Sequence, residues 1–370
     1  MRYLLTSFLP LALMGCPKTP APEVATPAGD VVPDPVLVSV LGEAMGGVLR
    51  VEVRCPSEAE RVACMDAAVA ARKEVERLNS MIDVWNTEGD IARLNTNAGN
   101  GPVSISKDTY RMLVASQVVA AASGGAFDVT IGALSGLWGI PGADLPAPEV
   151  IQDRLSRVSW NRLHVQTLEA ELEDEEMSVI LDGVVKGDAA GVALEQIPQQ
   201  WEARVHVATE VAVRGEWEVT MDIPGVENQQ AIVRVKNTVL VDSGTYIESL
   251  EIGGGHYKQV LDPRTGEMAS GANVSIVAHS QGAIADALAT TLRITGPDTP
   301  AVEQLGAWAL LMTDDGVVEM GKRGNAVLDW RLVNPDEASG AEDSSPAEGA
   351  EIEEEVAEEP PAQPEAAPEE

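Results

Sequence analysis

Apolar and polar residues follow two different periods along this chain, and together they predict a mixture of strands and helices. Leu49 to Val53 alternates apolar and polar positions like a half-buried strand. Ser57, with Glu60 three residues later, has the form of a capping box, which predicts a helix from Ser57 that ends near Asn79. Further helices are predicted over Ser106–Ala122, Pro148–Val158, Asp188–Ile197 and Ala283–Ile294.

Short alternating segments dominate the second half of the chain. Strands are predicted over Leu163–Gln166, Glu169–Leu172, Ser178–Leu181, Arg204–Val207, Trp217–Met221, Ala231–Val235 and Thr238–Val241, and a closing hairpin over Ala309–Met312 and Val317–Met320. Helices do not alternate regularly with strands, and many strands are joined by short turns. The predicted fold class is therefore α+β, with a largely antiparallel sheet and packed helices.

The N-terminal residues 1–16 have the pattern of an export signal. Arg2 precedes an apolar run that is too short to span a bilayer. The run ends in Leu13-Met14-Gly15-Cys16, which resembles a bacterial lipobox, so the prediction is an exported lipoprotein anchored to the membrane through lipidated Cys16, on the periplasmic face. An ordinary cleaved signal with an incidental cysteine is the alternative. Residues 17–36 are rich in Pro and Ala and predict a tether.

Charge separates the two ends of the remaining chain. Residues 335–370 contain no Lys or Arg, and Asp336 to Glu370 holds 14 of the 59 acidic residues, which predicts a solvated, disordered tail. A functional acidic arm is the alternative. Residues 37–334 form the predicted domain, and because this part is also acidic, nucleic acid is not expected as a partner.

Cys55 and Cys64 are the cysteines left after Cys16. Export would place them in an oxidising compartment, where a disulfide persists, so we expect them to pair. Cys55 would end a strand and Cys64 would lie in the next helix, and the separation of their Cα atoms decides the matter.

A possible metal site comes from the predicted helix near the C-terminal third. Asp286 and Thr290 stand at positions i and i+4, so they project two hard oxygens from one helix face, as Mg²⁺ prefers. Upstream, Lys186-Gly187 opens a predicted helix, where a cation and free amides suit phosphate. The glycines before Phe127 would let backbone amides approach a ligand. The combination indicates a magnesium site that handles a nucleotide diphosphate.

The order of these blocks resembles the ApbE family, FAD:protein FMN transferases, from about Met45 to Thr313. The supporting blocks are Met45-Gly46-Gly47, Trp85 to Asn95, Gly125 to Gly139, Gly183 to Gly187, Ser243 to Tyr246, Asp262 to Gly266 and Asp286 to Thr290. The resemblance implies that FMN is moved from FAD onto a Ser or Thr hydroxyl of a partner flavoprotein, with release of AMP.

The resemblance also implies a set of site residues. Mg²⁺ would be held by Asp286, Thr290 and an oxygen of Gly183, and Asp286 and Lys186 would be catalytic. Trp85, where the family usually has Tyr, would stack on the flavin ring. FAD would contact Met45, Trp85, Gly125, Ala126, Phe127, Asp128, Asp182, Lys186 and Val260.

Several positions depart from the family's usual residues. Gln259 stands where His is common, and Gln cannot act as a general base. Ala208-Thr209 replaces a Gly-Gly pair, and Asp188 replaces a Tyr after the Lys-Gly pair. Two alternatives to transfer stay open: an FAD pyrophosphatase that gives FMN and AMP with water as acceptor, and a flavin-binding lipoprotein without catalysis.

Overall fold

The computed structural model describes residues 35–82, 87–135, 137, 146–223, 229–244, 250–252, 255–257 and 260–334. Trp85 and Gln259 lie outside the described residues, as do the export signal at 1–16, most of the tether at 17–36, and the tail at 335–370. No helix within the described ranges is both long enough and apolar enough to cross a membrane.

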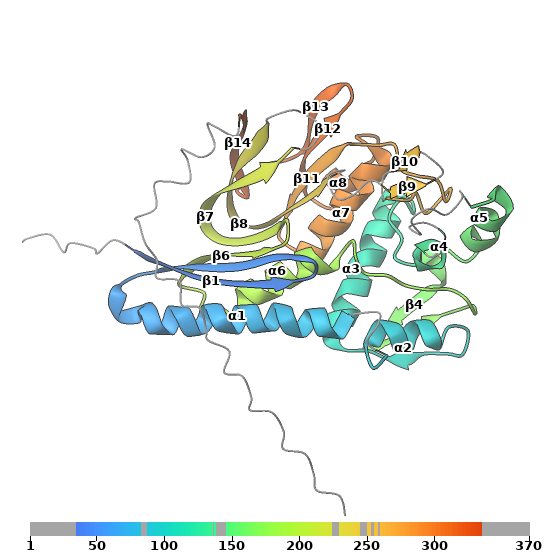
Figure 1. The fold of residues 1–370 in the computed structure, drawn as a ribbon, viewed down its shortest axis with the longest axis horizontal. Helices are drawn as coiled ribbons and strands as arrows, with labels where there is room; N and C mark the ends of the chain where they lie inside the picture. The colour runs from blue at the N-terminus through green and yellow to red at the C-terminus, as the bar shows by residue number, and fades with distance from the viewer. Residues whose placement is uncertain are drawn as a thin grey trace, which may run out of the picture. The chain divides into compact units, whose positions relative to one another are not determined.

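A nine-stranded antiparallel sheet forms the centre of the described structure (Figure 1). Eight of its strands follow in the order β1-β2-β6-β7-β8-β11-β12-β13, and β14 pairs with β8. Their bounds are β1 Val36–Ala44, β2 Gly47–Cys55, β6 Glu202–Val207, β7 Glu210–Asp222, β8 Gln230–Gly244, β11 Val274–His279, β12 Trp308–Thr313, β13 Gly316–Gly321 and β14 Val327–Val333. The fold class predicted from the sequence is confirmed.

Smaller sheets and the helices complete the described chain. One small sheet has the order β3-β5-β4, and β9 pairs with β10. These strands are β3 Val103–Ser104, β4 Leu163–Gln166, β5 Glu169–Leu172, β9 Leu250–Ile252 and β10 Gly255–Tyr257. The helices are α1 Arg61–Ile82, α2 Asp90–Thr96, α3 Lys107–Ser123, α4 Gly132–Ser135, α5 Pro148–Leu155, α6 Val185–Glu195, α7 Gly282–Thr295 and α8 Ala301–Gln304, with 3₁₀ turns at Glu58–Glu60 and Trp160–Arg162.

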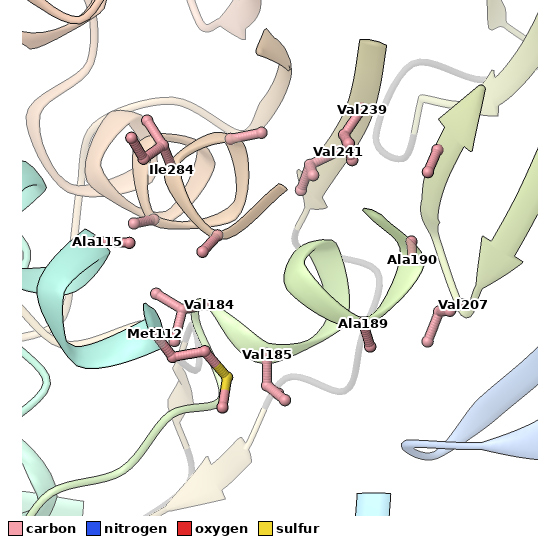
Figure 2. Packing of buried hydrophobic residues seen from close by; sticks show 14 of the residues in the cluster. Met112, Ala115, Val184, Val185, Ala189, Ala190, Val207, Val239, Val241 and Ile284 are labelled. Atoms are coloured by element: carbon pink, nitrogen blue, oxygen red, sulfur yellow. The ribbon is translucent and has the colours of Figure 1, made fainter. Parts of the chain in front are cut away.

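Helices α1, α6 and α7 pack on one face of the main sheet, and α3 packs against α7. Alternating residues of the strands supply the sheet side of this core, as Val239 and Val241 of β8 do beside α6 and α7 in Figure 2. Small residues such as Ala189 and Ala190 let α6 approach the sheet closely. The core thereby places the starts of α6 and α7 next to each other.

A second apolar cluster lies on the opposite face of the later strands. Its largest fully buried side chain is Trp308 of β12. Strand β8 pairs with β14 over Gln230–Val235 and with β11 over Val239–Gly244, so its two halves join different neighbours. Because β11 and β12 are covered on both faces, they are nearly continuous apolar runs rather than alternating ones.

Most predicted elements are confirmed, with small differences at their ends. β4 and β5 have the predicted bounds, whereas the two strands predicted over 231–235 and 238–241 are one long strand, β8. The strand predicted over Ser178–Leu181 is wrong. There the Asn95 amide group bonds both the N–H and the C=O of Val179, at 2.8 and 3.0 Å, and the Ile180 N–H donates to Val129. A side chain thus takes the place of a neighbouring strand.

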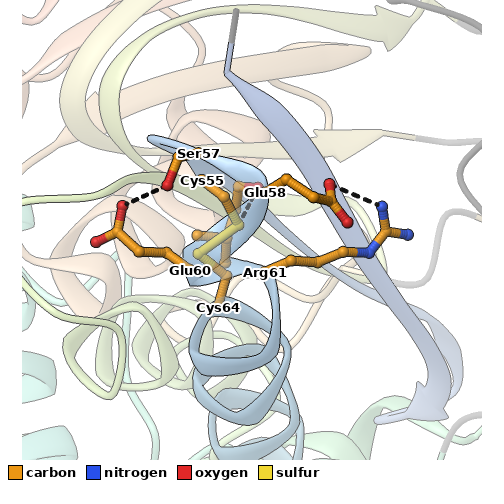
Figure 3. Close-up of a disulfide and its surroundings, with 7 residues drawn as sticks. Cys55, Ser57, Glu58, Glu60, Arg61 and Cys64 are labelled. Atoms are coloured by element: carbon orange, nitrogen blue, oxygen red, sulfur yellow. Dashed lines mark hydrogen bonds and ion pairs between the residues drawn. A yellow bond between two sulfur atoms is a disulfide. The ribbon is translucent and has the colours of Figure 1, made fainter. Parts of the chain in front are cut away.

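The expected disulfide between Cys55 and Cys64 is present (Figure 3). Cys55 ends β2, Cys64 lies in α1, and their Cα atoms are 6.1 Å apart, within the range that a disulfide spans. Between them the capping box is only partly formed. The Ser57 hydroxyl donates to the Glu60 carboxylate rather than accepting a backbone N–H, so a 3₁₀ turn precedes α1. The disulfide ties the end of the strand to the start of the helix.

Candidate active site

A cavity of about 400 Å³ opens beside the loop between α3 and α4. Of the residues predicted to bind FAD or metal, seven line it: Ala126, Phe127, Asp128, Asp182, Gly183, Val260 and Thr290. The lining also contains residues that were not among the predicted ligand contacts: Val129, Ile131, Ser135, Ile180, Leu261, Pro263, Met268 and Ile294. Three separate stretches of the chain and helix α7 therefore meet at one cavity.

One wall of the cavity is apolar and closely packed. Ala126, Ala269 and Ile294 form a small buried cluster against which Val260 packs. Gly183 lies where a side chain would not fit without movement, because a Cβ there would come within 3.0 Å of Phe127 and 3.2 Å of the Thr290 hydroxyl oxygen. The glycine therefore lets Phe127 and Thr290 approach the same point. This arrangement suits a flat apolar group next to an oxygen ligand.

Asp128 shapes this cavity through its own hydrogen bonds. One carboxylate oxygen accepts the N–H and the hydroxyl of Thr130 at 2.8 and 2.7 Å, and the other accepts the N–H of Trp160 at 2.7 Å. Burial raises the pKa of Asp128, although these hydrogen bonds act in the opposite direction. Both oxygens are occupied, so Asp128 holds the loop in place whether or not it also touches a ligand.

The junction of α6 and α7 has no space for side chains at its two glycines. A Cβ on Gly282 would come within 1.8 Å of the carbonyl oxygen of Gly187. This close approach brings Asp286 to α6, where its carboxylate accepts the N–H of Gly187 at 3.0 Å. Burial, together with the nearby charge of Glu210, raises the pKa of Asp286 to about 8. Asp286 is thus a buried carboxyl held at the start of α6.

Lys186 belongs to the same buried cluster and does not line the cavity. Its ammonium lies 2.9 Å from Glu210, which is 1% exposed. Burial lowers the pKa of Lys186, but the charges of Glu210, Asp286 and Asp242 outweigh it, so that pKa is raised. Burial also raises the pKa of Glu210, against the effect of the lysine. The Lys186 ammonium is therefore paired with Glu210 and also feels the charges of Asp286 and Asp242.

The remaining predicted residues lie elsewhere. Met45 is in the turn between β1 and β2, where its N–H donates to the Asn79 side chain, and Gly125 follows the C-cap of α3, where its N–H donates to the Ala120 carbonyl. Neither lines the cavity. Trp85 and Gln259 lie outside the described residues.

Glu210 and Asp242 are the charged residues that sequence reasoning passed over. Each stands directly beside a short apolar run, Val211–Val213 for Glu210 and Val239–Val241 for Asp242, and that signal was available from the sequence. A lone acidic residue among valines predicts a buried partner, which for Glu210 is Lys186.

Two of the departures from the family pattern are accommodated locally. Ala208 adopts a φ of 56°, a left-handed conformation that glycine tolerates more easily, and its N–H still donates to Val48. Asp188 is paired with Arg111, whose guanidinium donates to both carboxylate oxygens at 2.8 and 2.6 Å. Its negative charge is therefore matched within the fold, between α3 and α6.

The chemistry of the donors fits a hard divalent cation. Thr290 supplies a hydroxyl and Gly183 lies beside it, while Asp286 stands one turn earlier on α7. The surrounding carboxyl groups outnumber the one lysine, so added positive charge is favourable. No group of three or more His, Cys, Asp or Glu residues is arranged to hold a metal within the ranges the structure describes. A cation here would depend on one carboxylate with hydroxyl and carbonyl oxygens.

This fold and site define a class of α+β proteins with a nucleotide-sized cavity beside a buried carboxylate. Residues 45–307 match the ApbE family, and the chain belongs to that family. It is 24% identical over 264 residues to an FAD:protein FMN transferase of Vibrio cholerae, covering 66% of this chain and 79% of the relative. An Escherichia coli FAD:protein FMN transferase is 26% identical over 331 residues, covering 83% and 90%.

Solved structures share the fold. The flavin transferase ApbE from Vibrio cholerae superposes with a TM-score of 0.65 at 20% identity, covering 77% of this chain and 97% of that structure. The ApbE protein from Thermotoga maritima gives a TM-score of 0.67 at 21% identity over the same shares. At this level of identity the superpositions establish the fold, which agrees with the family match.

Proposed function

We propose that this chain transfers the FMN half of FAD onto a Ser or Thr hydroxyl of a partner flavoprotein and releases AMP. The observation that carries the proposal is the apolar cavity at Ala126 to Val129, which reaches Thr290 one helical turn from the buried carboxyl of Asp286. The relatives named FAD:protein FMN transferase support the same reaction.

In the reaction, the acceptor hydroxyl oxygen forms a bond to the FMN-side phosphorus. The bond from that phosphorus to the bridging oxygen breaks, AMP leaves with the bridging oxygen, and the hydroxyl proton passes to water or to the leaving phosphate. Such transfers need alignment and charge neutralisation more than covalent help from the protein. The residues of the cavity would orient the flavin half, with Phe127 and Val260 against its apolar surface and Asp182 at the rim.

We also propose that the reaction depends on a divalent cation. Mg²⁺ is the expected ion because the donors here are hard oxygen atoms. Asp286, Thr290 and the backbone oxygen of Gly183 would hold it, and when bound it supplies neutralisation of the diphosphate charge. Lys186 remains a proposed contributor of positive charge behind the site, although its ammonium is paired with Glu210.

The test is a transfer assay with the signal-free protein, FAD, Mg²⁺ and a flavin-acceptor domain, read by intact mass. Transfer predicts an acceptor heavier by FMN minus water, together with equimolar AMP. Free FMN and AMP without labelled acceptor would instead establish a pyrophosphatase. Bound FAD with no AMP under excess Mg²⁺ would establish a binding protein and overturn the proposal.

We propose in addition that the protein is an exported lipoprotein, anchored through Cys16, that modifies acceptors on the periplasmic side of the membrane. The lipobox-like Leu13 to Cys16 supports this placement. Cells grown with a labelled fatty acid should incorporate label into the full chain and not into a Cys16→Ser variant. Equal labelling of both would exclude the anchor.

A further inference from the structure

Two buried carboxyl groups from different elements lie near Lys186: Glu210 is its ion-pair partner, and Asp286 accepts the N–H of the neighbouring Gly187. Glu210 follows the turn from β6 to β7, and Asp286 lies in the second turn of α7. The charge of Lys186 acts on both carboxyl groups, but its ion pair, at 2.9 Å, is with Glu210. Lys186 therefore forms its ion pair with Glu210 and not with Asp286.

Local hydrogen bonds explain this choice. The second oxygen of Glu210 accepts the N–H of Thr209 at 3.1 Å, which fixes the carboxylate at the end of the turn. Asp286 instead accepts the N–H of Gly187 at 3.0 Å. Each carboxylate thus accepts one backbone N–H, and the Lys186 ammonium is the second partner of Glu210. The carboxylate of Asp286 stays beside a cation without forming its ion pair.

We propose that Glu210 is a positioning residue for the transfer reaction: by binding the ammonium of Lys186, it keeps that charge from pairing with Asp286 and leaves the Asp286 carboxylate available to a divalent cation. This inference rests on the proposed function, because it assumes that Asp286 binds the metal. It assigns to the Lys186–Glu210 pair a role in metal affinity rather than in phosphate contact. Removing the carboxylate of Glu210 would release the ammonium toward Asp286, where it competes with the metal.

The test measures Mg²⁺ binding by calorimetry on metal-free protein without FAD. Glu210→Gln should bind Mg²⁺ about tenfold more weakly than the wild type, as expected when a group behind a metal ligand is removed. Glu210→Gln combined with Lys186→Met should regain most of the lost affinity, because the competing charge is gone. Glu218→Gln, on the same strand but exposed, is the matched control and should leave affinity unchanged. In transfer assays, Glu210→Gln should need about tenfold more Mg²⁺ for half-maximal rate.

The rescue distinguishes positioning from a purely structural role. If the double variant binds no more tightly than Glu210→Gln, or if Glu210→Gln binds as well as the wild type, the inference is wrong. Should Glu210→Gln not fold, Lys186→Met alone decides, since weaker binding than the wild type would contradict a competing ammonium. If wild-type protein and Asp286→Ala both bind no Mg²⁺, the proposed metal site itself fails and the inference with it. If Mg²⁺ binding is lost in Asp286→Ala yet unchanged in Glu210→Gln, the inference about Glu210 is wrong but the proposed metal site stands.

Discussion

The candidate site has two halves of different polarity, an apolar cavity and a buried charged cluster. The cavity is walled by apolar residues such as Phe127 and Val260, and Asp128 beside them is fully engaged in hydrogen bonds with its own loop. One helical turn away, the cluster of Asp286, Glu210 and Lys186 is buried and charged. The comparison teaches that shape and charge are supplied separately: packing forms the cavity, while the α6–α7 junction holds the charge. Each half can therefore be disturbed without the other.

The strongest way to break the charged half is to remove the Asp286 carboxyl. Asp286→Ala should lower FMN transfer about 10³-fold, because the divalent cation that would neutralise the diphosphate loses its main ligand. The measurement is AMP release under saturating FAD. Asp286→Asn, which keeps the shape, is the companion variant and should lose nearly as much. Near-wild-type activity in both variants would show that the buried carboxyl has no part in the reaction.

Forcing the α6–α7 junction apart should disturb the charged half by destabilising the fold around it. Gly282→Ala places a Cβ within 1.8 Å of the Gly187 carbonyl oxygen and should reduce the free energy of unfolding by about 3 kcal/mol. Gly191→Ala in α6 is the matched control, because its Cβ would meet Val239 at an ordinary 3.7 Å. Urea denaturation compares the two. Equal stability of both variants would mean that the helices are not held as closely as described.

The burial of Asp286 also predicts a pH effect on stability. With a pKa raised from 3.8 to about 8, folded protein keeps a proton that the unfolded chain releases near pH 4. The folded state binds more protons in this window, so metal-free stability should fall as pH rises from 4 to 8. Asp286→Asn, which stays neutral, should lack this loss, so it should be more stable than wild type at pH 8 and by a smaller margin at pH 5.

Melting temperatures in chelator at the two pH values test this sign. Asp66→Asn, at an exposed position of α1, is the control; it keeps Asp286 and should therefore follow the wild type at both pH values. A wild-type protein that is as stable as Asp286→Asn at pH 8 would contradict the raised pKa.

The smallest expected effect concerns the point where the two halves meet. Thr290→Val keeps the volume but removes the hydroxyl next to Gly183, and should lower transfer at limiting Mg²⁺ about tenfold with little change in stability. Thr291→Val also deletes a hydroxyl from α7, but that hydroxyl donates to the Ala287 carbonyl and does not line the cavity. If both variants respond alike to Mg²⁺, Thr290 is not a ligand.

How much the sequence revealed depended on whether a signal was local. Helical periodicity correctly placed Asp286 and Thr290 on one helix, and alternation located most strands of the antiparallel sheet. The family resemblance assigned Phe127, Gly183 and Val260 to one site, and the three residues line the same cavity. The strand at Ser178–Leu181 failed because Asn95, far away in sequence, satisfies its backbone.

Pairing between distant side chains was the other gap. The partnership of Lys186 with Glu210 depends on the turn at Ala208 and on how β7 lies against α6, which no local pattern encodes. The ladder of β8 with both β11 and β14 is non-local in the same way.

Helix α7 is buried along most of its length. From Gly282 to Ile294 every residue is buried except Thr290, which stands at the cavity. Substitution elsewhere along this stretch alters the core, so its rate of accepted change should be low. Position 290 is therefore where a substitution should change the proposed metal site while the packing of the helix stays intact.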